Sequence, residues 1–249
     1  QSLERVLGRL LGVECYTLAD ASDLFRRPAA QYVPIRDGAE VALRTVGTGP
    51  DVLFVHGWPV SGATFRRLLP HLVEHVTCHV IDMPGVGSSR FSDATPLSID
   101  MHIESVRATI DHLGLYQVAV VGHDSGGLIA RHAVAGDARL RALGLIDTEQ
   151  SAGLTWRFKS FLAARHAPGL GAGLGWICGK PRLRRSQLVF GGAFHDRSML
   201  DGEFDEFFLT PLHQSKERRD AGAALLRSLE RRHLDQMADL HRRIDVPVQ

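Results

Sequence analysis

The segment Val120-Val121-Gly122-His123-Asp124-Ser125-Gly126-Gly127 decides the fold, because it joins an apolar strand pattern to a helical one through a glycine-rich turn. Its form, Gly-x-acid-x-Gly, is typical of a sharp strand-to-helix turn that pushes its central side chain out above a sheet. Side chains two residues before and two after such an apex would clash. Because Gly122 and Gly126 flank Asp124 symmetrically, we expect Asp124, and not Ser125, at the apex.

Short apolar runs rich in β-branched residues occur on both sides of this turn, at residues 51–56, 76–81, 117–121 and 143–146. They alternate with helical patterns, which predicts an α/β protein with a buried parallel sheet. Upstream, residues 31–35 and 40–46 alternate apolar and polar side chains around Arg36-Asp37-Gly38, which predicts a hairpin. Apolar residues at helical spacing predict a helix over residues 98–113, with Ser98 as N-cap and Gly114 as the stop.

The domain division follows from where these patterns change. We predict a core over residues 1–150 that begins with a helix, and a helical cap over residues 151–233, where the strand pattern disappears. Residues 234–249 return to the core, through an amphipathic helical run that spans residues 216–244. Val246 begins another strand pattern and the sequence stops at Gln249, so we expect the final strands to be missing.

Composition excludes several classes of protein. The 249-residue chain is 44% hydrophobic and 23% charged, which is ordinary for a globular protein. Its 29 Lys and Arg against 28 Asp and Glu leave a formal charge of +1, too little to recruit nucleic acid or an anionic membrane. The N-terminus does not match a signal peptide, and no apolar run is long enough to span a bilayer. Three widely spaced cysteines favour a reducing, cytoplasmic setting.

Two further motifs carry a resemblance to a known family. His56-Gly57-Trp58-Pro59 ends a predicted strand, and Asp82-Met83-Pro84-Gly85-Val86-Gly87-Ser88-Ser89 follows the next one. Together with the Asp124 turn and the long helical insertion, they make the chain similar to the α/β-hydrolase family. Within it, the chain resembles the branch with an aspartate nucleophile, the haloalkane dehalogenases and soluble epoxide hydrolases. The resemblance implies an α/β-hydrolase fold, a mostly parallel sheet flanked by helices with a helical cap.

The resemblance also implies a mechanism in two steps. The Asp124 carboxylate attacks an sp3 carbon to form an alkyl-enzyme ester, and water activated by a His–acid pair hydrolyses that ester. The backbone amides of Trp58 and Ser125 would hold the leaving anion. The expected partners are a small apolar substrate and water, without cofactor or metal, in a pocket lined by His56, His123, Trp156 and Trp176.

The resemblance leaves the His–acid pair incomplete. The family's catalytic His follows the last strand, a position that this sequence does not reach, so we expect a truncated chain. Asp147 lies near the position that some dehalogenases use for the acid, although a polar residue that closes a strand explains it equally well.

The substrate class stays open at this stage. We expect hydrolysis of a carbon–halogen bond in a small apolar haloalkane, although Ser125 stands where many dehalogenases have Trp. Epoxide hydrolysis by the same ester mechanism is the alternative, but the predicted cap has none of the tyrosines that protonate the opening oxygen. A serine esterase that uses Ser125 and a non-catalytic binding protein on this fold are further alternatives.

Two competing motifs carry little weight. His71-Leu72-Val73-Glu74-His75 matches a zinc peptidase signature but has no obvious third ligand, and Gly85-x-Gly87 lacks the rest of a dinucleotide fingerprint.

Overall fold

The sheet is mostly parallel, as the alternation of strands and helices predicts. The computed structural model describes residues 15–150 and 155–249, and in these ranges six strands lie in the order β1-β2-β4-β3-β5-β6. The last four of that order run parallel, whereas β1 pairs with β2 and β2 pairs with β4 in antiparallel fashion. The strands are β1 (Gln31–Pro34), β2 (Glu40–Gly47), β3 (Asp51–Val55), β4 (Thr77–Asp82), β5 (Val118–His123) and β6 (Leu140–Ile146).

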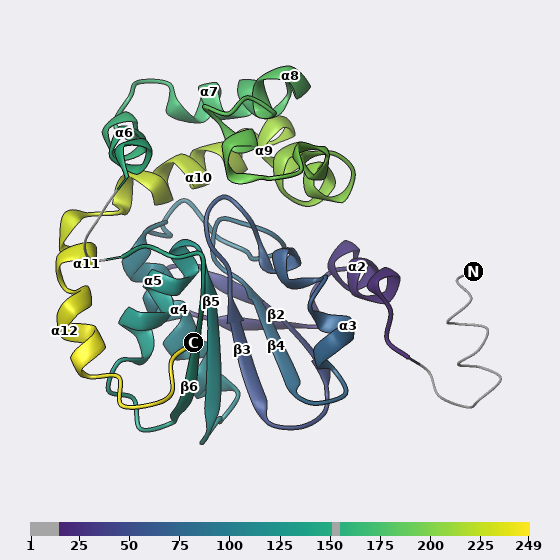
Figure 1. Cartoon of the computed structure of the whole chain (residues 1–249), viewed down its shortest axis with the longest axis vertical. Coiled ribbons are helices and arrows are strands. Elements are labelled where there is room, and N and C mark those ends of the chain that lie inside the picture. The colour runs from purple at the N-terminus through teal and green to yellow at the C-terminus, as the bar shows by residue number, and fades with distance from the viewer. Residues whose placement is uncertain (1–14, 151–154) are drawn as a thin grey trace.

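Helices cover both faces of the sheet (Figure 1). On one face, α4 (Ile99–His112) and α5 (Ser125–Val134) pack against side chains such as Leu53 and Val120. On the other face, α2 (Leu18–Arg26), η1 (Gly62–Phe65) and α3 (Leu69–Leu72) pack against Phe54 and Val80. This alternation along each strand buries apolar side chains on both sides, which stabilises a parallel sheet. The first fourteen residues of the predicted N-terminal helix lie outside the described residues.

A group of helices lies beyond the end of the sheet where β5 leads into α5 (Figure 1). We call it the helical layer. A buried cluster that includes Leu174, Leu200 and Leu212 holds it together. Its elements are α6 (Trp156–Ala164), α7 (Leu170–Cys178), α8 (Pro181–Arg184), η2 (Phe190–Ala193), η3 (Arg197–Leu200), the π-helix η4 (Asp205–Leu209), α9 (Thr210–Gln214) and α10 (Lys216–Ser228).

The chain then returns to the core through α11 (Arg231–Asp235) and α12 (Met237–Arg242). The predicted amphipathic run over residues 216–244 is therefore three helices, because α10 ends at Ser228 and the next residue, Leu229, adopts an extended conformation. Residues 247–249 pair in parallel with β6, where the Leu143 amide donates to the Pro247 carbonyl at 3.0 Å. The strand pattern that begins at Val246 thus extends the sheet at its β6 edge.

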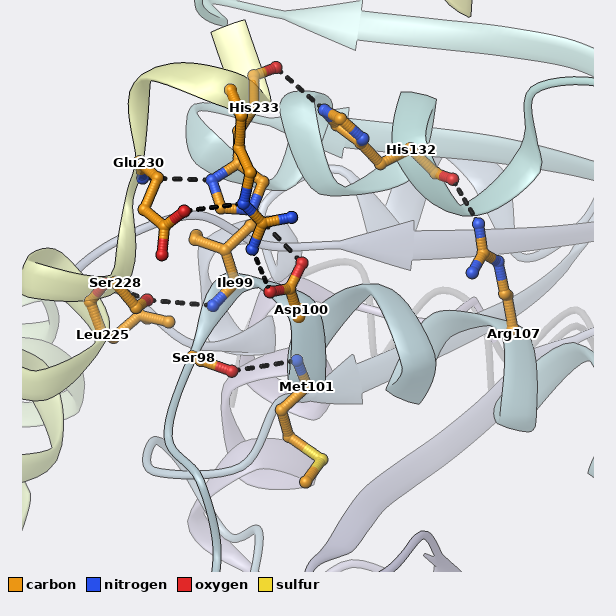
Figure 2. Close-up of polar contacts among 11 residues, drawn as sticks. Ser98, Ile99, Asp100, Met101, Arg107, His132, Leu225, Ser228, Glu230 and His233 are labelled. Carbon is orange, nitrogen blue, oxygen red and sulfur yellow. Dashed lines mark hydrogen bonds and ion pairs between the residues drawn. The ribbon is translucent and has the colours of Figure 1, made fainter. Parts of the chain in front are cut away.

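A polar joint fastens α10 and α11 to α4 and α5 (Figure 2). Buried His233 donates from Nε2 to Asp100 at 3.2 Å, and its Nδ1 accepts the Glu230 amide at 3.0 Å. Its carbonyl accepts from Nε2 of His132 at 2.9 Å. We call this set of residues, with Ser98 and Ser228, the α4–α11 joint. Its contacts join parts of the chain that are 133 residues apart.

Within the described residues, no helix is both long enough and apolar enough to cross a bilayer. The boundaries drawn from the sequence between core and cap stay a prediction.

Candidate active site

Asp124 stands at the turn between β5 and α5. Its backbone has φ 54° and ψ −135°, a left-handed region that non-glycine residues seldom adopt. The helix α5 begins at the next residue, Ser125, so the turn from strand to helix is completed at a single residue. Such strain persists only where surrounding packing enforces it, and it lifts the Asp124 side chain out of the line of the strand.

Three glycines make this turn sterically possible. A Cβ on Gly126 would lie 2.3 Å from the Val55 carbonyl oxygen, and a Cβ on Gly122 would lie 2.5 Å from Cα of Gly127. A Cβ on Gly57 would lie 2.3 Å from the Asp124 carboxylate. The two turns, at residues 56–59 and 122–127, therefore touch through backbone that only glycine allows.

Backbone amides hold the Asp124 carboxylate. The Trp58 amide donates to Oδ2 of Asp124 at 2.9 Å and to Oγ of Ser125 at 3.0 Å. Burial raises the pKa of Asp124 to about 6, even though hydrogen bonds from the Ser125 and Trp58 amides favour the charged form. Asp124 is therefore mostly ionised at neutral pH, in a partly desolvated position where it can accept a proton or attack an electrophile.

Trp58 also connects this site to the helical layer. Its indole Nε1 donates to the carbonyl of Gly222 in α10 at 2.9 Å. The backbone of Trp58 thus contacts the Asp124 carboxylate, while its ring contacts the helical layer. A shift of α10 would be transmitted to the amide that faces Asp124.

His56 has a structural position. Its side chain is buried, Nε2 accepts the Met83 amide at 2.9 Å, and Nδ1 donates to the Gly57 carbonyl at 2.9 Å. Burial lowers its pKa, so the ring is neutral with the proton on Nδ1. The sequence predicted His56 in the lining of a substrate pocket. Because both of its ring nitrogens bind backbone, it instead holds the turn that carries Trp58.

His123 precedes the apex, and one of its ring nitrogens lacks a hydrogen bond to the described residues. Its Nδ1 is buried without a hydrogen-bond partner in the described part of the chain, and its ring meets Phe65 edge-on at 6.4 Å. Burial lowers its pKa, opposed by the charges of Asp147 and Glu149. His123 therefore adds a neutral ring beside the apex.

The loop after β6 brings two more carboxyl groups to the site. His123 pairs with Ile146 across β5 and β6, so the residues after each strand are neighbours. Asp147 is exposed, with φ 48°, and its charge acts to raise the pKa of Asp124. Glu149 is part-buried, and burial followed by the Asp124 charge raises its pKa to about 7.

Glu149 was not predicted from the sequence. The signal available was its place three residues beyond a strand that neighbours the apex strand, since such strand ends meet at one edge of a parallel sheet. The sequence predicts Asp147 alone as the acid. The structure brings both carboxyl groups toward Asp124 and gives Glu149 the more buried position.

The two tryptophans predicted for the pocket lie on the surface. Trp156 is 68% exposed and Trp176 is 59% exposed. Neither indole is enclosed, so the structure does not support them as donors to an anion in the site, and Trp58 is the tryptophan that it brings to Asp124.

The loop at residues 82–89 is held in place by the buried Asp82 carboxylate. The buried Asp82 carboxylate pairs with buried Arg44 at 3.0 Å and accepts the Gly62 and Ser88 amides, each at 2.8 Å. A Cβ on Gly87 would lie 2.3 Å from that carboxylate, so this glycine serves the fold and not a phosphate. No cluster of three potential metal ligands occurs in the described residues, where α3 ends at Leu72 and divides the His71–His75 motif.

Comparison with known proteins agrees with this geometry. The family model described as alpha/beta hydrolase fold matches residues 50–170, which include the Trp58 turn and the Asp124 apex. A solved α/β hydrolase fold protein from Burkholderia ambifaria superposes with a TM-score of 0.69 at 22% identity, over 90% of this chain and 79% of that one. A haloalkane dehalogenase from Bradyrhizobium elkani gives 0.64 at 21% identity, over 85% and 74%. The chain has the α/β-hydrolase fold, as expected.

Curated relatives point to a different activity from the one expected. The chain is 34% identical over 104 residues to the pimeloyl-[acyl-carrier protein] methyl ester esterase of Stenotrophomonas maltophilia, which covers 42% of this chain and 38% of that esterase. It is 36% identical over 101 residues to the esterase of the same name from Xanthomonas campestris pv. campestris, which covers 41% and 38%. The chain thus matches less than half the length of these relatives.

These relatives overturn the expectation of a haloalkane dehalogenase. Structural likeness to a dehalogenase at 21% identity shows the fold alone, whereas the curated relatives with higher identity are esterases. The prediction was wrong because it inferred the reaction from the residue type at the apex, which fixes neither the bond cleaved nor the leaving group. The esterase alternative agrees better with the comparisons.

Proposed function

We propose that this chain carries the site of a carboxylic ester hydrolase, with the Asp124 carboxylate as its reacting group. The observation that carries the proposal is the apex itself, where a mostly ionised carboxylate lies against the Trp58 and Ser125 amides. The esterase names of the curated relatives support an ester as the substrate.

In this proposal Asp124 acts as general base. It takes a proton from a water molecule, whose oxygen attacks the ester carbonyl carbon. The carbonyl oxygen replaces the present acceptors on the Trp58 and Ser125 amides, which stabilise the negative charge that develops there. Ser125 contributes its amide, because its hydroxyl is buried and accepts from the Trp58 amide at 3.0 Å.

Helices α6–α10 act as the cap of this site in our proposal. The support is the hydrogen bond from the Trp58 ring to Gly222 in α10, which places that helix next to the catalytic turn. A substrate chain would lie between α10 and the apex.

The test measures how fast the full chain hydrolyses methyl esters of straight-chain acids. A pH-stat records the acid that is released. Asp124→Asn keeps the size and polarity of the side chain but removes the base, so kcat/KM should fall by about 10³-fold. Ser125→Ala should retain activity to within about tenfold, because the amide remains. An unaffected Asp124→Asn variant would refute the proposal.

A serine nucleophile is separated from this mechanism by a second readout. The Ser125 hydroxyl lies 3.5 Å from the Asp124 carboxylate, so Asp124 could also deprotonate it. In that case a fluorophosphonate probe would label Ser125, and Ser125→Ala would abolish both labelling and turnover. Our proposal expects no labelling at this position.

Epoxide hydrolysis is the second candidate, favoured by the fact that the apex residue is a carboxylate that can attack carbon directly. One experiment separates the two roles of Asp124. In a single turnover in ¹⁸O-water, a nucleophilic Asp124 acquires ¹⁸O in its own carboxyl group when the alkyl ester is hydrolysed. A general base leaves the label in the product only.

A further inference from the structure

A second carboxyl group is built into the same site and has no role in the mechanism above. Glu149 follows β6, the strand that pairs with the apex strand β5. Its Oε2 accepts from the Thr148 hydroxyl at 3.2 Å, and no cation lies within ion-pair distance of it among the residues that the structure describes. A part-buried carboxyl group without a cation retains its proton more readily than an exposed one.

Buried Arg131 fixes the position of this group. Its Nε donates to the Gly127 carbonyl at 2.9 Å, and one terminal nitrogen donates to the Thr148 hydroxyl at 2.8 Å and the Glu149 carbonyl at 2.7 Å. The guanidinium thus binds the backbone of Glu149, and within the described ranges no ion pair forms with its carboxyl group. Arg131 belongs to α5, so the loop is attached to the helix that begins at the apex.

Close packing confirms that this loop lies against the first turn of α5. A Cβ on Gly127 would lie 2.4 Å from the Thr148 hydroxyl oxygen. The loop therefore cannot move away from the apex without breaking the Arg131 hydrogen bonds.

We propose that Glu149 is the proton donor of this site, the acid that complements the base Asp124. This inference rests on the proposed ester hydrolysis. Asp124 takes a proton from the attacking water, the water oxygen bonds to the carbonyl carbon, and the bond from that carbon to the alcohol oxygen breaks. Glu149 gives its proton to the departing alcohol, which leaves Glu149 ionised and Asp124 protonated. The proton then passes back from Asp124 to Glu149 through water, and the cycle is closed.

The charges around the pair agree with this assignment of roles. The charge of Asp147 raises the pKa of Asp124, whereas Arg131 acts to lower that of Glu149. The charges of Asp147 and Glu149 in turn act on His123. Burial raises the pKa of both carboxyl groups, and the charge of Asp124 raises the pKa of Glu149 further, to about 7. A protonated Glu149 beside an ionised Asp124 can act as acid and base at the same pH.

Leaving-group dependence tests this role. The full chain and Glu149→Gln are compared on a methyl ester, whose alkoxide must be protonated to leave, and on a p-nitrophenyl ester of the same acid, whose phenolate leaves unaided. Loss of the acid should lower kcat about 10²-fold on the methyl ester and less than about threefold on the p-nitrophenyl ester. Glu149→Asp, which retains an acid, should recover part of the methyl ester activity.

Three results would overturn the inference. Equal losses on both esters would make Glu149 structural, no loss on either would make it irrelevant, and the same selective loss in Asp147→Asn alone would assign the acid to Asp147. Failure of the ester hydrolase proposal is distinct, because the parent chain would then hydrolyse neither ester, or Asp124→Asn would retain full activity on both.

A measurement that needs no turnover complements the kinetics. The Glu149 carboxyl can be titrated by ¹³C NMR in the full chain and in Asp124→Asn. Because the Asp124 charge raises the pKa of Glu149, removal of that charge should lower it. An unchanged value would show that the two groups are too far apart to exchange a proton.

Discussion

The active-site turn and the α4–α11 joint both place acids beside histidines, yet they differ in how those groups are paired. In the joint, both ring nitrogens of His233 are bonded (Figure 2). Asp100 accepts from His233 and from its chain neighbour Arg232. At the turn, His123 has an unpartnered buried Nδ1 among the described residues, and Asp124 is held by amides with no cation.

The pKa values follow that difference. Burial raises the pKa of Asp124 to about 6, whereas at Asp100 hydrogen bonds from Arg232 and His233 outweigh burial and hold the pKa below its usual value. A paired acid stabilises the fold, while an acid buried without a counter-ion costs stability and is ready for chemistry. Among the residues that the structure describes, the absence of cation partners, and not the presence of acids and histidines, distinguishes the candidate active site from the joint.

The largest expected effect comes from filling the contact that forms the turn. Gly126→Ala places a Cβ 2.3 Å from the Val55 carbonyl oxygen, a backbone atom that cannot rotate away. We expect a loss of about 3 kcal/mol in the free energy of unfolding and loss of ester hydrolysis. Urea denaturation and the methyl ester assay measure both.

A matched control lies in the helical layer. Gly173 in α7 has open space where its Cβ would lie. Gly173→Ala should leave stability unchanged or raise it by up to about 1 kcal/mol, because alanine favours helix. Similar losses in the two variants would show that the tight packing at the turn is not special.

The sequence predicted those features of the fold that depend on local pattern. The strand runs, the Ser98 N-cap, whose hydroxyl accepts the Met101 amide at 3.2 Å, and the Asp124 apex follow from residues close in the chain. The alternation of strand and helix patterns along the chain is also local, and it predicted the parallel sheet.

Features that depend on distant residues could not be predicted in this way. The pairing of Asp100 with His233 joins segments 133 residues apart, and no periodicity marks either residue for it. The proposed role of Glu149 depends on the position in which Arg131 holds its loop. The same local sequence in a loop without these contacts would be exposed to solvent. The reaction itself was predicted wrongly, since an acid at the apex does not specify the bond that it helps to cleave.

Replacing aspartate by asparagine should change the folding stability in opposite directions in the two regions. The native pKa of Asp124 is raised, so between pH 4 and 6 the folded state binds more protons than the unfolded state, and stability falls as pH rises through this window. Asp124→Asn removes the cost of the charge. It should be about 2 kcal/mol more stable than the parent at pH 8 and equal to it at pH 4, although its ester hydrolysis should be about 10³-fold slower.

The control for this prediction is Asp100→Asn in the joint. Because the pKa of Asp100 is lowered, its charge stabilises the folded state above the usual carboxyl pKa and this contribution is lost as pH falls. The group is half exposed, so the loss at pH 8 should be below about 1 kcal/mol. Denaturation of both variants at pH 4 and pH 8 measures the signs; two destabilised variants at pH 8 would remove the distinction between the regions.

The smallest expected effect concerns the hydroxyl groups that cap α4 within the joint. Ser98 binds the Met101 amide from within the helix start, whereas Ser228 binds the Ile99 amide at 2.9 Å from the end of α10. Each substitution by alanine leaves one helix N-terminal amide without its partner, so each should cost about 1 kcal/mol. Only Ser228→Ala also removes a hydrogen bond between α10 and the core. Hydrogen exchange should therefore show faster exchange in α10 for Ser228→Ala than for Ser98→Ala at equal global stability. Equal exchange would mean that the remaining contacts of the joint, above all Asp100 with His233, suffice to hold the helical layer in place.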